Sequence, residues 1–299
     1  MDFSVAIPTY NREDDLIELF ESVLKQDALP SEILIIDDWE LDTKVLSYIR
    51  EKAKTLGVSF AYHQKKAAGE PRGLAESRNV AFKLARNEIV FMLDDDLVLK
   101  EHFFQNIMKV WGKYFSDENL IGVGGFIENE RKKGKLEEVF NKIFGLVSSI
   151  SWDINEVGFQ VWDDTLQEPS KVYYFHGGVA SYRKKICQAI GFASLSPGRT
   201  ALEDVEFCLR AKNLGYYFII LPDALVIHKK SKKSRDSDLI LGIKESFNRN
   251  QIFLRNCKKS LRNYLWFIWA NIGWILRQFL AGNFIKGYGM IIGIFKRRK

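Results

Sequence analysis

Short apolar runs alternate with amphipathic segments through the first third of the chain, and this alternation constrains the fold more than any other feature. The apolar runs have the composition of buried strands and occupy residues 3–8, 32–38, 58–63 and 88–93. Between them, apolar residues recur with helical spacing. Strand and helix repeats of this kind build a mainly parallel sheet with helices on its faces. We therefore expect an α/β fold with a Rossmann-like, mainly parallel central sheet flanked by helices.

The second half of the chain is less regular. A strand and turn are expected in 172–186, a helix from about residue 202, and a strand that ends at His228. Residues 129–172 carry a basic patch and several Trp but show no clear period. We expect a variable loop or lid there, because long irregular segments in compact domains are usually functional.

Composition limits the class of protein. With 299 residues and 46% hydrophobic content, the chain can form one large domain or a domain with an appendage. Its three cysteines have neither disulfide-framework nor zinc-site spacing, which favours a reducing compartment. The N-terminus is acidic with an early proline and does not resemble a secretory signal. We expect a cytoplasmic protein.

The net charge of +6 is unevenly distributed. From residue 229 to the end there are 17 Lys and Arg against 3 Asp and Glu, so this segment carries +14 and the preceding one −8. A basic tail seeks anionic partners such as lipid headgroups or nucleic acid.

Within this tail, residues 263–281 form an apolar helical pattern with a narrow polar stripe. The stripe consists of Asn263, Asn271, Arg277 and Gln278. The apolar run 264–276, in which Asn271 is the one polar residue, has 13 residues, and about 20 are needed to cross a bilayer. We expect an amphipathic helix at a membrane interface, rich in Trp and with basic residues on both sides. The flanking basic residues are Lys258, Lys259, Arg262 and the terminal 296–299. The alternatives are a core-packing or dimer-forming helix and a hairpin insertion.

Polar and acidic side chains follow the predicted strands at the points where the strands end. They are Pro8, Thr9, Tyr10 and Asn11 after the first, Asp37 and Asp38 after the second, and Asp94, Asp95 and Asp96 after the fourth. Ligands of parallel α/β sheets bind at this edge. Clustered carboxylates repel one another, so a positive group is expected among them. Asp94 and Asp96 alternate and can share a hard cation such as Mg²⁺ or Mn²⁺, which bridges phosphate oxygens.

Seven stretches resemble the family 2 glycosyltransferases of GT-A fold in order and spacing. They are SVAIPTYNR, ILIIDD, GLAESRNVAF, IVFMLDDD, GGVASYRKKICQAIGF, LEDVEFCLRAKNLGY and PDALVIH, and together they extend from Ser4 to His228. Enzymes of this family pass a sugar from a nucleoside diphosphate to an acceptor hydroxyl with inversion. The resemblance therefore implies a GT-A fold, a Mn²⁺ or Mg²⁺ cofactor and a UDP-, GDP- or dTDP-sugar donor.

The resemblance also assigns roles to individual residues. Donor-binding residues would be Pro8, Thr9, Tyr10 and Asn11 in the nucleotide pocket, Asp38 at the base, Gly73 and Arg78 near base and phosphates, Asp95 beside sugar or metal, and Gly177 and Gly178 at a close-approach turn. Metal ligands would be Asp94, Asp96 and His228, and the catalytic base Asp204 with Glu203 beside it. Guanidinium pairs with phosphate in a bidentate way, and adjacent carboxylates raise one another's pKa toward neutrality.

Several of these residues also have a plainer explanation. Asp38 can cap a helix, Arg78 can form an exposed salt bridge, and 94–96 can be a solvated turn. A histidine after an apolar strand is commonly a satisfied core residue, and acids at 203–204 favour a helix start.

Two departures from the family pattern narrow the expected activity. Trp39 and Glu40 follow the second-strand aspartates, where a small turn residue is usual, so the pattern does not specify which nucleotide base the donor carries. The QxxRW motif of processive synthases is absent after His228, which favours single addition.

Together these features predict a glycosyltransferase domain at 1–235, divided into a nucleotide-binding half at 1–126 and an acceptor half at 127–235, followed by a membrane-associating tail at 236–299. The expected acceptor is a membrane-borne or lipid-linked hydroxyl used in glycan assembly, and the enzyme would lie peripherally on the inner face of the cell membrane. No nucleic acid is expected as a partner.

Two other functions compete. A sugar-nucleotide pyrophosphorylase would need a Gly-rich basic loop near the N-terminus, and PTYNRED lacks glycine. A lipid- or nucleic-acid-binding module with a degenerate nucleotide pocket would leave the seven stretches unexplained.

Overall fold

A computed structural model describes residues 1–130, 134–162, 166–196 and 201–296. Its main sheet has the order β3-β2-β1-β4-β10-β6-β11-β5, and β9 pairs with β11 beside this path. The strands are β1 (Phe3–Thr9), β2 (Glu32–Asp37), β3 (Ser59–Gln64), β4 (Ile89–Leu93), β5 (Leu97–Leu99), β6 (Leu120–Ile127), β9 (Ser170–Val172), β10 (Val179–Arg183) and β11 (Tyr217–His228). β1, β2, β3 and β4 are parallel, as the sequence predicts.

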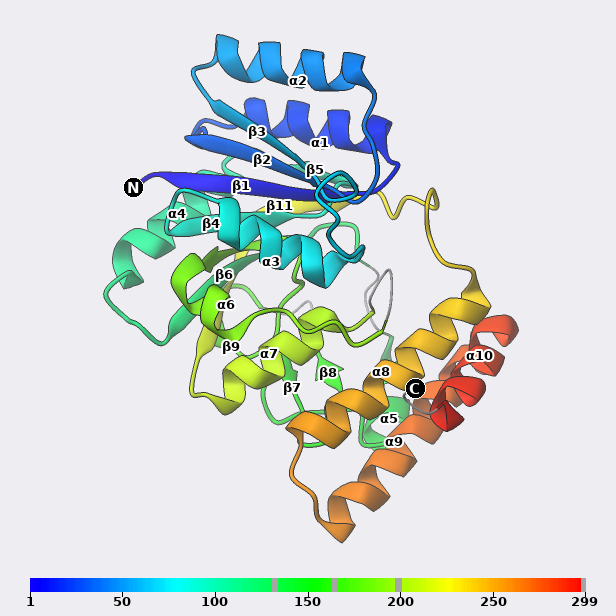
Figure 1. Cartoon of the computed structure of the whole chain (residues 1–299). Coiled ribbons are helices and arrows are strands. Elements are labelled where there is room, and N and C mark those ends of the chain that lie inside the picture. The colour runs from blue at the N-terminus through cyan, green and yellow to red at the C-terminus, as the bar shows by residue number, and fades with distance from the viewer. Residues whose placement is uncertain (131–133, 163–165, 197–200, 297–299) are drawn as a thin grey trace.

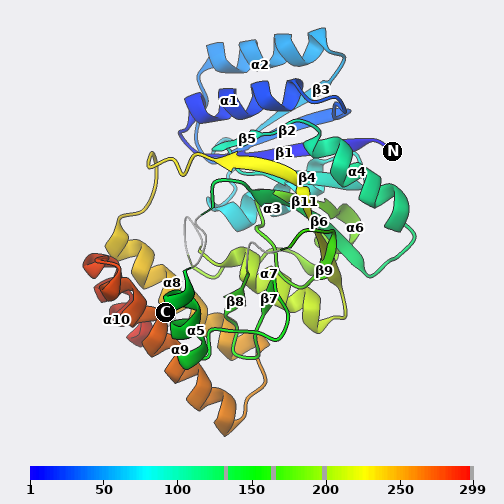
Figure 2. The same cartoon turned by 180° about the vertical axis from the view of Figure 1, so that it is seen from behind.

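Helices cover both faces of this sheet (Figures 1 and 2). One face carries α1 (Glu13–Leu24), α2 (Thr43–Thr55) and α4 (Phe103–Tyr114), and the other carries α3 (Leu74–Leu84), α6 (Lys184–Ile190) and α7 (Glu203–Asn213). Alternate strand residues enter different cores: Val5 and Ile7 pack on the α1 side and Ala6 on the α3 side. The strands are therefore buried on both faces, which accounts for their continuous apolar runs. The predicted α/β class is confirmed.

Two antiparallel strands bring distant residues to one edge. β10 is antiparallel to β4, with Val179 opposite Leu93, so the residues just before β10 meet those just after β4. β11 is antiparallel to β5, with His228 opposite Leu97, so the end of β11 lies beside Asp96. The apolar patterns alone do not reveal these two directions.

The segment predicted as an irregular loop contains regular elements. They are α5 (Lys135–Ile143), the hairpin β7 (Asp153–Ile154) and β8 (Gln160–Val161), and β9. The strands are short, and the apolar Leu136, Val139 and Ile143 of α5 point to solvent, so the segment lacks the pattern of a core-packed unit. Part of the basic patch, residues 131–133, and residues 163–165 lie outside the described residues.

Three helices follow the sheet and lie at the opposite end of the molecule from α1 and α2 (Figure 1). They are α8 (Asp238–Asn256), α9 (Leu261–Leu280) and α10 (Phe284–Phe295). The backbones of α8 and α10 are in close contact. A Cβ on Gly242 would lie only 2.2 Å from the Lys286 carbonyl oxygen, so glycine is needed there. A third core joins these helices to the α5–β8 segment, and it contains Leu146, Val157, Phe159, Phe253, Phe267 and Trp274. The C-terminal helices are therefore integrated with the insertion between β6 and β9.

The helix predicted at 263–281 is present as α9, and its orientation shows which side of the predicted polar stripe faces the protein. Asn263 and Asn271 of the polar stripe are buried, whereas Leu265 and Ile268 are exposed. None of the helices in the described part of the chain combines the length and apolar character needed to span a bilayer. The terminal residues 297–299, part of the predicted basic flank, lie outside the described residues.

Candidate active site

The ends of β1, β2, β4 and β11 surround one cavity of about 480 Å³, which we call the edge cavity. Its lining includes nine of the residues predicted from the sequence, namely His228 and the residues Pro8, Thr9, Tyr10, Asp38, Gly73, Asp94, Asp95 and Asp96. The lining also includes residues that the sequence did not single out: Arg12, Arg72, Leu74, Ser77, Ser234, Arg235, Asp236 and Lys244. The strand-end side chains therefore meet in one space, as parallel topology requires.

Asp38 is held by three donors at the wall of the edge cavity. Lys65 Nζ lies 2.5 Å from Asp38 Oδ1, the Gly73 amide donates to Oδ2 at 2.9 Å, and Ser77 Oγ donates to Oδ1 at 3.0 Å. Lys65 is completely buried, so this ion pair is shielded from solvent. The carboxylate is thereby oriented between the end of β2 and the start of α3, and its predicted contact with the base stays a prediction.

Tyr10 and Trp39 extend this side of the cavity outward. Their rings lie 6.2 Å apart in an edge-on arrangement, and the Arg72 guanidinium stacks 4.2 Å from the Tyr10 centroid. Asn11 has a left-handed backbone with φ 51° and does not line the cavity, and its carbonyl accepts a hydrogen bond from Ser234 Oγ at 3.3 Å.

Arg12 supplies the positive charge expected among the aspartates. Its Nη1 lies 2.8 Å from Asp95 Oδ1 and 3.4 Å from Asp96 Oδ2. Thr9 Oγ1 donates to Asp95 Oδ2 at 2.9 Å, so both oxygens of Asp95 have protein partners. Burial raises the pKa of Asp95 to about 6 although Arg12 opposes the shift. Asp95 therefore anchors the turn after β4, and its predicted contact with sugar or metal stays a prediction.

Asp96 and His228 face each other, with Nε2 3.1 Å from Asp96 Oδ1. The other oxygen of Asp96 accepts from the Ser231 amide at 3.1 Å and lies 3.4 Å from Arg235 Nη2. Burial alone would raise the pKa of Asp96, but the His228 hydrogen bond and the nearby cations lower it below its usual range. The same contact raises the pKa of His228, although burial acts in the opposite direction.

The donor chemistry at this point fits a divalent cation. A carboxylate oxygen and an imidazole nitrogen converge between two strand ends, and Asp94 lines the same cavity. In the described residues, no three His, Cys, Asp or Glu side chains form a preassembled metal cluster. Asp94 instead lies toward Arg78, with Oδ1 3.5 Å from Nη2. The residues thus provide a two-atom donor pair and a third carboxylate nearby.

Arg78 joins the metal side of the site to the predicted base. It is 2% exposed, and its Nη1 lies 3.0 Å from Glu203 Oε1. The arrangement is not the exposed salt bridge considered as an alternative, because the guanidinium lies between two carboxylates inside the protein. The predicted phosphate contact stays a prediction. It thereby connects the end of β4 to the start of α7.

Gly177 and Gly178 allow this close approach. A Cβ on Gly178 would lie 2.1 Å from Asp94 Cγ, and one on Gly177 would lie 2.9 Å from Asp204 Cβ. The Asp94 amide also donates to the Gly178 carbonyl at 3.0 Å. The turn before β10 therefore lies against the Asp94 carboxylate and the base of the Asp204 side chain at once.

Glu203 and Asp204 begin α7 and differ in environment. Glu203 is buried, and burial raises its pKa to about 7 against the opposing charge of Arg78. Asp204 is half-buried, and its Oδ1 accepts from the Val205 amide at 2.8 Å. His176, which precedes the glycine turn, packs against Trp152 at 5.4 Å and Trp162 at 5.8 Å. Burial lowers the pKa of His176, while the negative charge of Asp204 opposes this shift.

The sequence interpretation missed Arg12, Lys65 and Arg235. Arg12 lies inside the stretch PTYNR, and the expectation of a cation beside the aspartates was a usable signal for it. Lys65 and Arg235 carry no such signal, because they reach the site from the end of β3 and from the segment after β11.

Comparisons with known proteins agree with this architecture. A family model described as glycosyl transferase family 2 matches residues 4–191. The chain is 25% identical over 176 residues to poly(ribitol-phosphate) beta-N-acetylglucosaminyltransferase TarS of Staphylococcus aureus (strain MW2), which covers 58% of the chain and 30% of TarS. It is 28% identical over 140 residues to UDP-Glc:alpha-D-GlcNAc-diphosphoundecaprenol beta-1,3-glucosyltransferase WfgD of Escherichia coli, which covers 43% of the chain and 51% of WfgD. The chain thus spans about a third to a half of these relatives.

Solved structures share the fold over nearly the whole chain. The mannosyltransferase PcManGT of Pyrobaculum calidifontis, in complex with GDP-Man and Mn²⁺, aligns with TM-score 0.57 and 18% identity, over 98% of this chain and 83% of that one. TarS 1–349 of S. aureus in complex with UDP-GlcNAc aligns with TM-score 0.54 and 18% identity, over 98% and 90%. At this identity the similarity shows the fold alone.

Proposed function

The chain belongs to glycosyl transferase family 2, and from this premise we propose that it transfers a sugar from a nucleoside diphosphate sugar to an acceptor hydroxyl. One observation carries the proposal. The edge cavity has a volume of about 480 Å³ and is lined by the Asp96–His228 donor pair and by Asp94. The Gly177–Gly178 turn lies against both Asp94 and Asp204 of α7 and so connects the donor pair to the predicted base.

The donor would occupy the edge cavity with its base near Tyr10 and Asp38 and its diphosphate near Asp96. Arg235 and Lys244 also line the cavity and add positive charge on the diphosphate side. The solved structures that share this fold include complexes with GDP-Man and with UDP-GlcNAc. They support a nucleotide-sugar donor but differ in its nucleotide base, so they do not specify the base for this chain.

A divalent cation held by Asp96 and His228, with Asp94 nearby, would neutralise charge on the departing diphosphate. Mn²⁺ accompanies the donor in PcManGT, and we propose Mn²⁺ or Mg²⁺ for this chain.

Asp204 would act as the general base. In an inverting transfer the acceptor oxygen attacks the anomeric carbon opposite the diphosphate, and its proton passes to the Asp204 carboxylate. Glu203, whose pKa is raised to about 7 mainly by burial, pairs with Arg78 and holds the start of α7 beside Asp94. The glycine turn brings the backbone close to both reacting partners.

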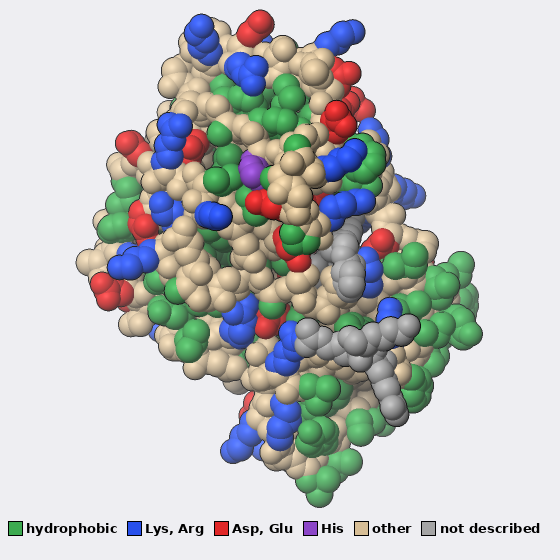
Figure 3. Space-filling view, viewed as in Figure 1, with side chains coloured by type: hydrophobic (Ala, Val, Ile, Leu, Met, Phe, Trp, Pro, Cys, Tyr) green, Lys and Arg blue, Asp and Glu red, His purple; other side chains and the backbone are tan. Residues whose placement is uncertain are grey.

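We also propose that α9 and α10 rest on an anionic membrane surface, where a lipid-linked acceptor would be found. Their exposed apolar residues include Leu261, Leu265, Ile268, Trp269, Ile272, Leu280, Phe284, Ile285, Tyr288 and Phe295. Exposed apolar residues gathered on one face are unusual in soluble monomeric proteins and often mark a protein or membrane contact. Figure 3 shows apolar side chains gathered over the lower right of the molecule, where these C-terminal helices lie. The basic Lys258 and Arg262 flank the start of α9.

The transfer is tested by incubating the protein with a panel of nucleoside diphosphate sugars and Mn²⁺ or Mg²⁺ and measuring nucleoside diphosphate release. We expect release from one donor class, with at least a hundredfold loss in Asp96→Ala and in Asp204→Asn. Asp204→Asn should still bind the nucleoside diphosphate, since it changes the base and leaves the edge cavity intact. Equal activity in both variants and the wild type would contradict the assignment.

Membrane association is tested by sedimentation with anionic phospholipid vesicles. Deleting the tail is a poor test, because Phe267 and Trp274 belong to the third core. The double variant Leu265→Glu/Ile268→Glu changes only exposed positions of α9, and it should abolish sedimentation. Lys54→Glu, on exposed α2 at the opposite end, is the control and should sediment normally. Undiminished sedimentation of the α9 variant would remove the membrane proposal.

A further inference from the structure

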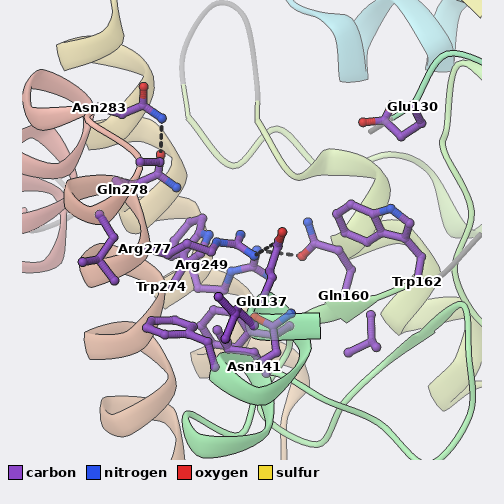
Figure 4. Close-up of a pocket in the computed structure, with 17 residues that line it drawn as sticks. Glu130, Glu137, Asn141, Gln160, Trp162, Arg249, Trp274, Arg277, Gln278 and Asn283 are labelled. Carbon is purple, nitrogen blue, oxygen red and sulfur yellow. Dashed lines mark hydrogen bonds and ion pairs between the residues drawn. The ribbon is translucent and has the colours of Figure 1, made fainter. Parts of the chain in front are cut away.

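A second cavity of about 580 Å³ lies between α5, the β7–β8 hairpin, α8 and α9, and we call it the hairpin cavity (Figure 4). Its walls differ in character. Phe140, Leu146 and Phe159 supply apolar surface, whereas Arg249 and Gln160 supply hydrogen-bonding groups. The lining also includes Glu130 and the ion pair of Arg277 with Glu137, whose Nη1 and Oε1 lie 3.5 Å apart. Apolar and hydrogen-bonding surface in one cavity suits a ligand with both characters.

Arg249 is the unusual group in this cavity. Its side chain is 1% exposed, and the guanidinium packs on the rings of Phe159 at 4.4 Å and Trp274 at 4.9 Å. It donates to the Gly158 carbonyl and to Gln160 Oε1, the latter at 2.8 Å. Among the described residues Arg249 forms no salt bridge and its Nε has no hydrogen-bond partner, whereas the neighbouring Arg277 pairs with Glu137 at 3.5 Å. Burial lowers the pKa of Arg249 to about 10 and the negative charge of Glu245 only partly opposes this shift, so an anion bound beside the guanidinium would stabilise its charge.

One side of the hairpin cavity leads toward Asp204, the proposed catalytic base. Trp162 lines the cavity, and in Figure 4 it lies beyond Gln160 as seen from Arg249. The Trp162 ring also packs against His176, which immediately precedes the turn that touches Asp204. A ligand seated at Arg249 can therefore extend along Trp162 toward α7.

The other side opens at the exposed apolar face. Leu136 of α5 and Leu280 of α9 both line the cavity, and they are 87% and 70% exposed. Val139 and Ile143 add to this face from α5, so α5 joins α9 and α10 on one apolar surface. Lys135 and Lys142 of the same helix are exposed, but Glu137 and Glu138 balance their charge, so α5 contributes apolar surface and no net positive charge.

We propose that the hairpin cavity binds the acceptor as an amphiphile, namely a lipid whose saccharide is joined to its apolar chain through a phosphate or diphosphate. The phosphate pairs with Arg249, the apolar chain leaves over Leu136 and Leu280 into the bilayer, and the saccharide extends past Trp162 to Asp204. This inference rests on the proposed glycosyl transfer and names the chemical class of its acceptor.

Binding is tested with three probes: farnesyl diphosphate, inorganic pyrophosphate and farnesol. Titrations are made by calorimetry with saturating Mn²⁺ and the nucleoside diphosphate that the transfer assay releases, so that the edge cavity is occupied. We expect farnesyl diphosphate to bind at least tenfold more tightly than either fragment. Pyrophosphate binding as tightly as farnesyl diphosphate would overturn the amphiphile proposal in favour of a plain phosphate site, and farnesol binding as tightly would overturn the role of the phosphate.

Arg249→Met keeps an unbranched apolar stem, shortens the side chain and removes the buried charge, and it should weaken farnesyl diphosphate binding at least tenfold. Arg255→Met is the matched control, since Arg255 is exposed on the same helix. Leu280→Asp changes an exposed position at the mouth and provides a variant that does not disturb the core; it should also weaken binding at least tenfold. Unchanged affinity in either Arg249→Met or Leu280→Asp would overturn the proposal.

The two proposals fail separately. Absence of nucleoside diphosphate release from every donor by the wild-type chain would refute the transfer itself. Normal release combined with undiminished farnesyl diphosphate binding in Arg249→Met would refute only the acceptor site.

Discussion

Replacing Arg78 by Met removes the cation that joins the two halves of the site. Arg78 is buried between Glu203, at 3.0 Å, and Asp94, at 3.5 Å. Removing one member of a buried pair leaves an uncompensated charge and costs about 3–5 kcal/mol of unfolding free energy. Because burial already raises the pKa of Glu203 to about 7, the loss of Arg78 raises it further. Above pH 7 the wild type ionises Glu203 and gains the ion pair with Arg78, which the variant cannot form, so the variant should be most destabilised relative to the wild type there. The difference should be smaller near pH 5.5, where Glu203 is protonated in both.

Urea unfolding followed by circular dichroism at pH 5.5 and pH 8 measures this loss. The double variant Arg78→Met/Glu203→Gln removes both charges and should recover at least half of it. Arg50→Met, at an exposed position of α2, is the control and should change stability by less than about 1 kcal/mol. The reasoning is refuted if the losses of Arg78→Met and Glu203→Gln simply add, or if the loss in Arg78→Met does not depend on pH.

Three further predictions follow from single contacts. Gly178→Ala places a Cβ 2.1 Å from Asp94 Cγ and should lower transfer activity at least a hundredfold, whereas Gly112→Ala, with no atom within 4 Å of its Cβ, should keep it; equal activities would contradict this. Glu203 has a folded pKa raised to about 7, so native protein holds a proton that unfolded chain releases, and wild-type stability should fall between about pH 5 and pH 7. Glu203→Gln should lack this decline in urea unfolding, and an identical decline would refute the assignment. Lys65→Met removes a buried ammonium and should weaken nucleoside diphosphate binding at least tenfold by calorimetry, which unchanged affinity would disprove.

The sequence was informative where function depends on strand ends. Asp38 and Asp96 each follow a continuous apolar run, and parallel pairing brings the ends of such runs to one edge. Their gathering around the edge cavity therefore follows from pattern and topology alone. His228 required the family resemblance, because the antiparallel pairing of β11 with β5 decides where it lies.

The partners of these residues were harder to predict. Arg78 and Glu203 are 125 positions apart, and nothing local in either segment indicates that they pair. The hairpin cavity was also missed, since its walls come from α5, β8 and α9. The exposed apolar side chains of α5 conceal its role, because a helix with an outward apolar face does not follow the pattern of core packing.

The central claim is that a divalent cation at Asp96 and His228 holds the diphosphate in the edge cavity. Calorimetric titration of UDP and GDP, with and without Mn²⁺, tests it most directly. One nucleotide should bind the wild-type chain only with Mn²⁺, should bind Asp204→Asn equally well, and should bind Asp96→Asn and His228→Asn at least tenfold more weakly. Nucleotide affinity that is the same with and without Mn²⁺ would contradict the account. So would unchanged affinity in both metal-site variants when circular dichroism shows that they are folded.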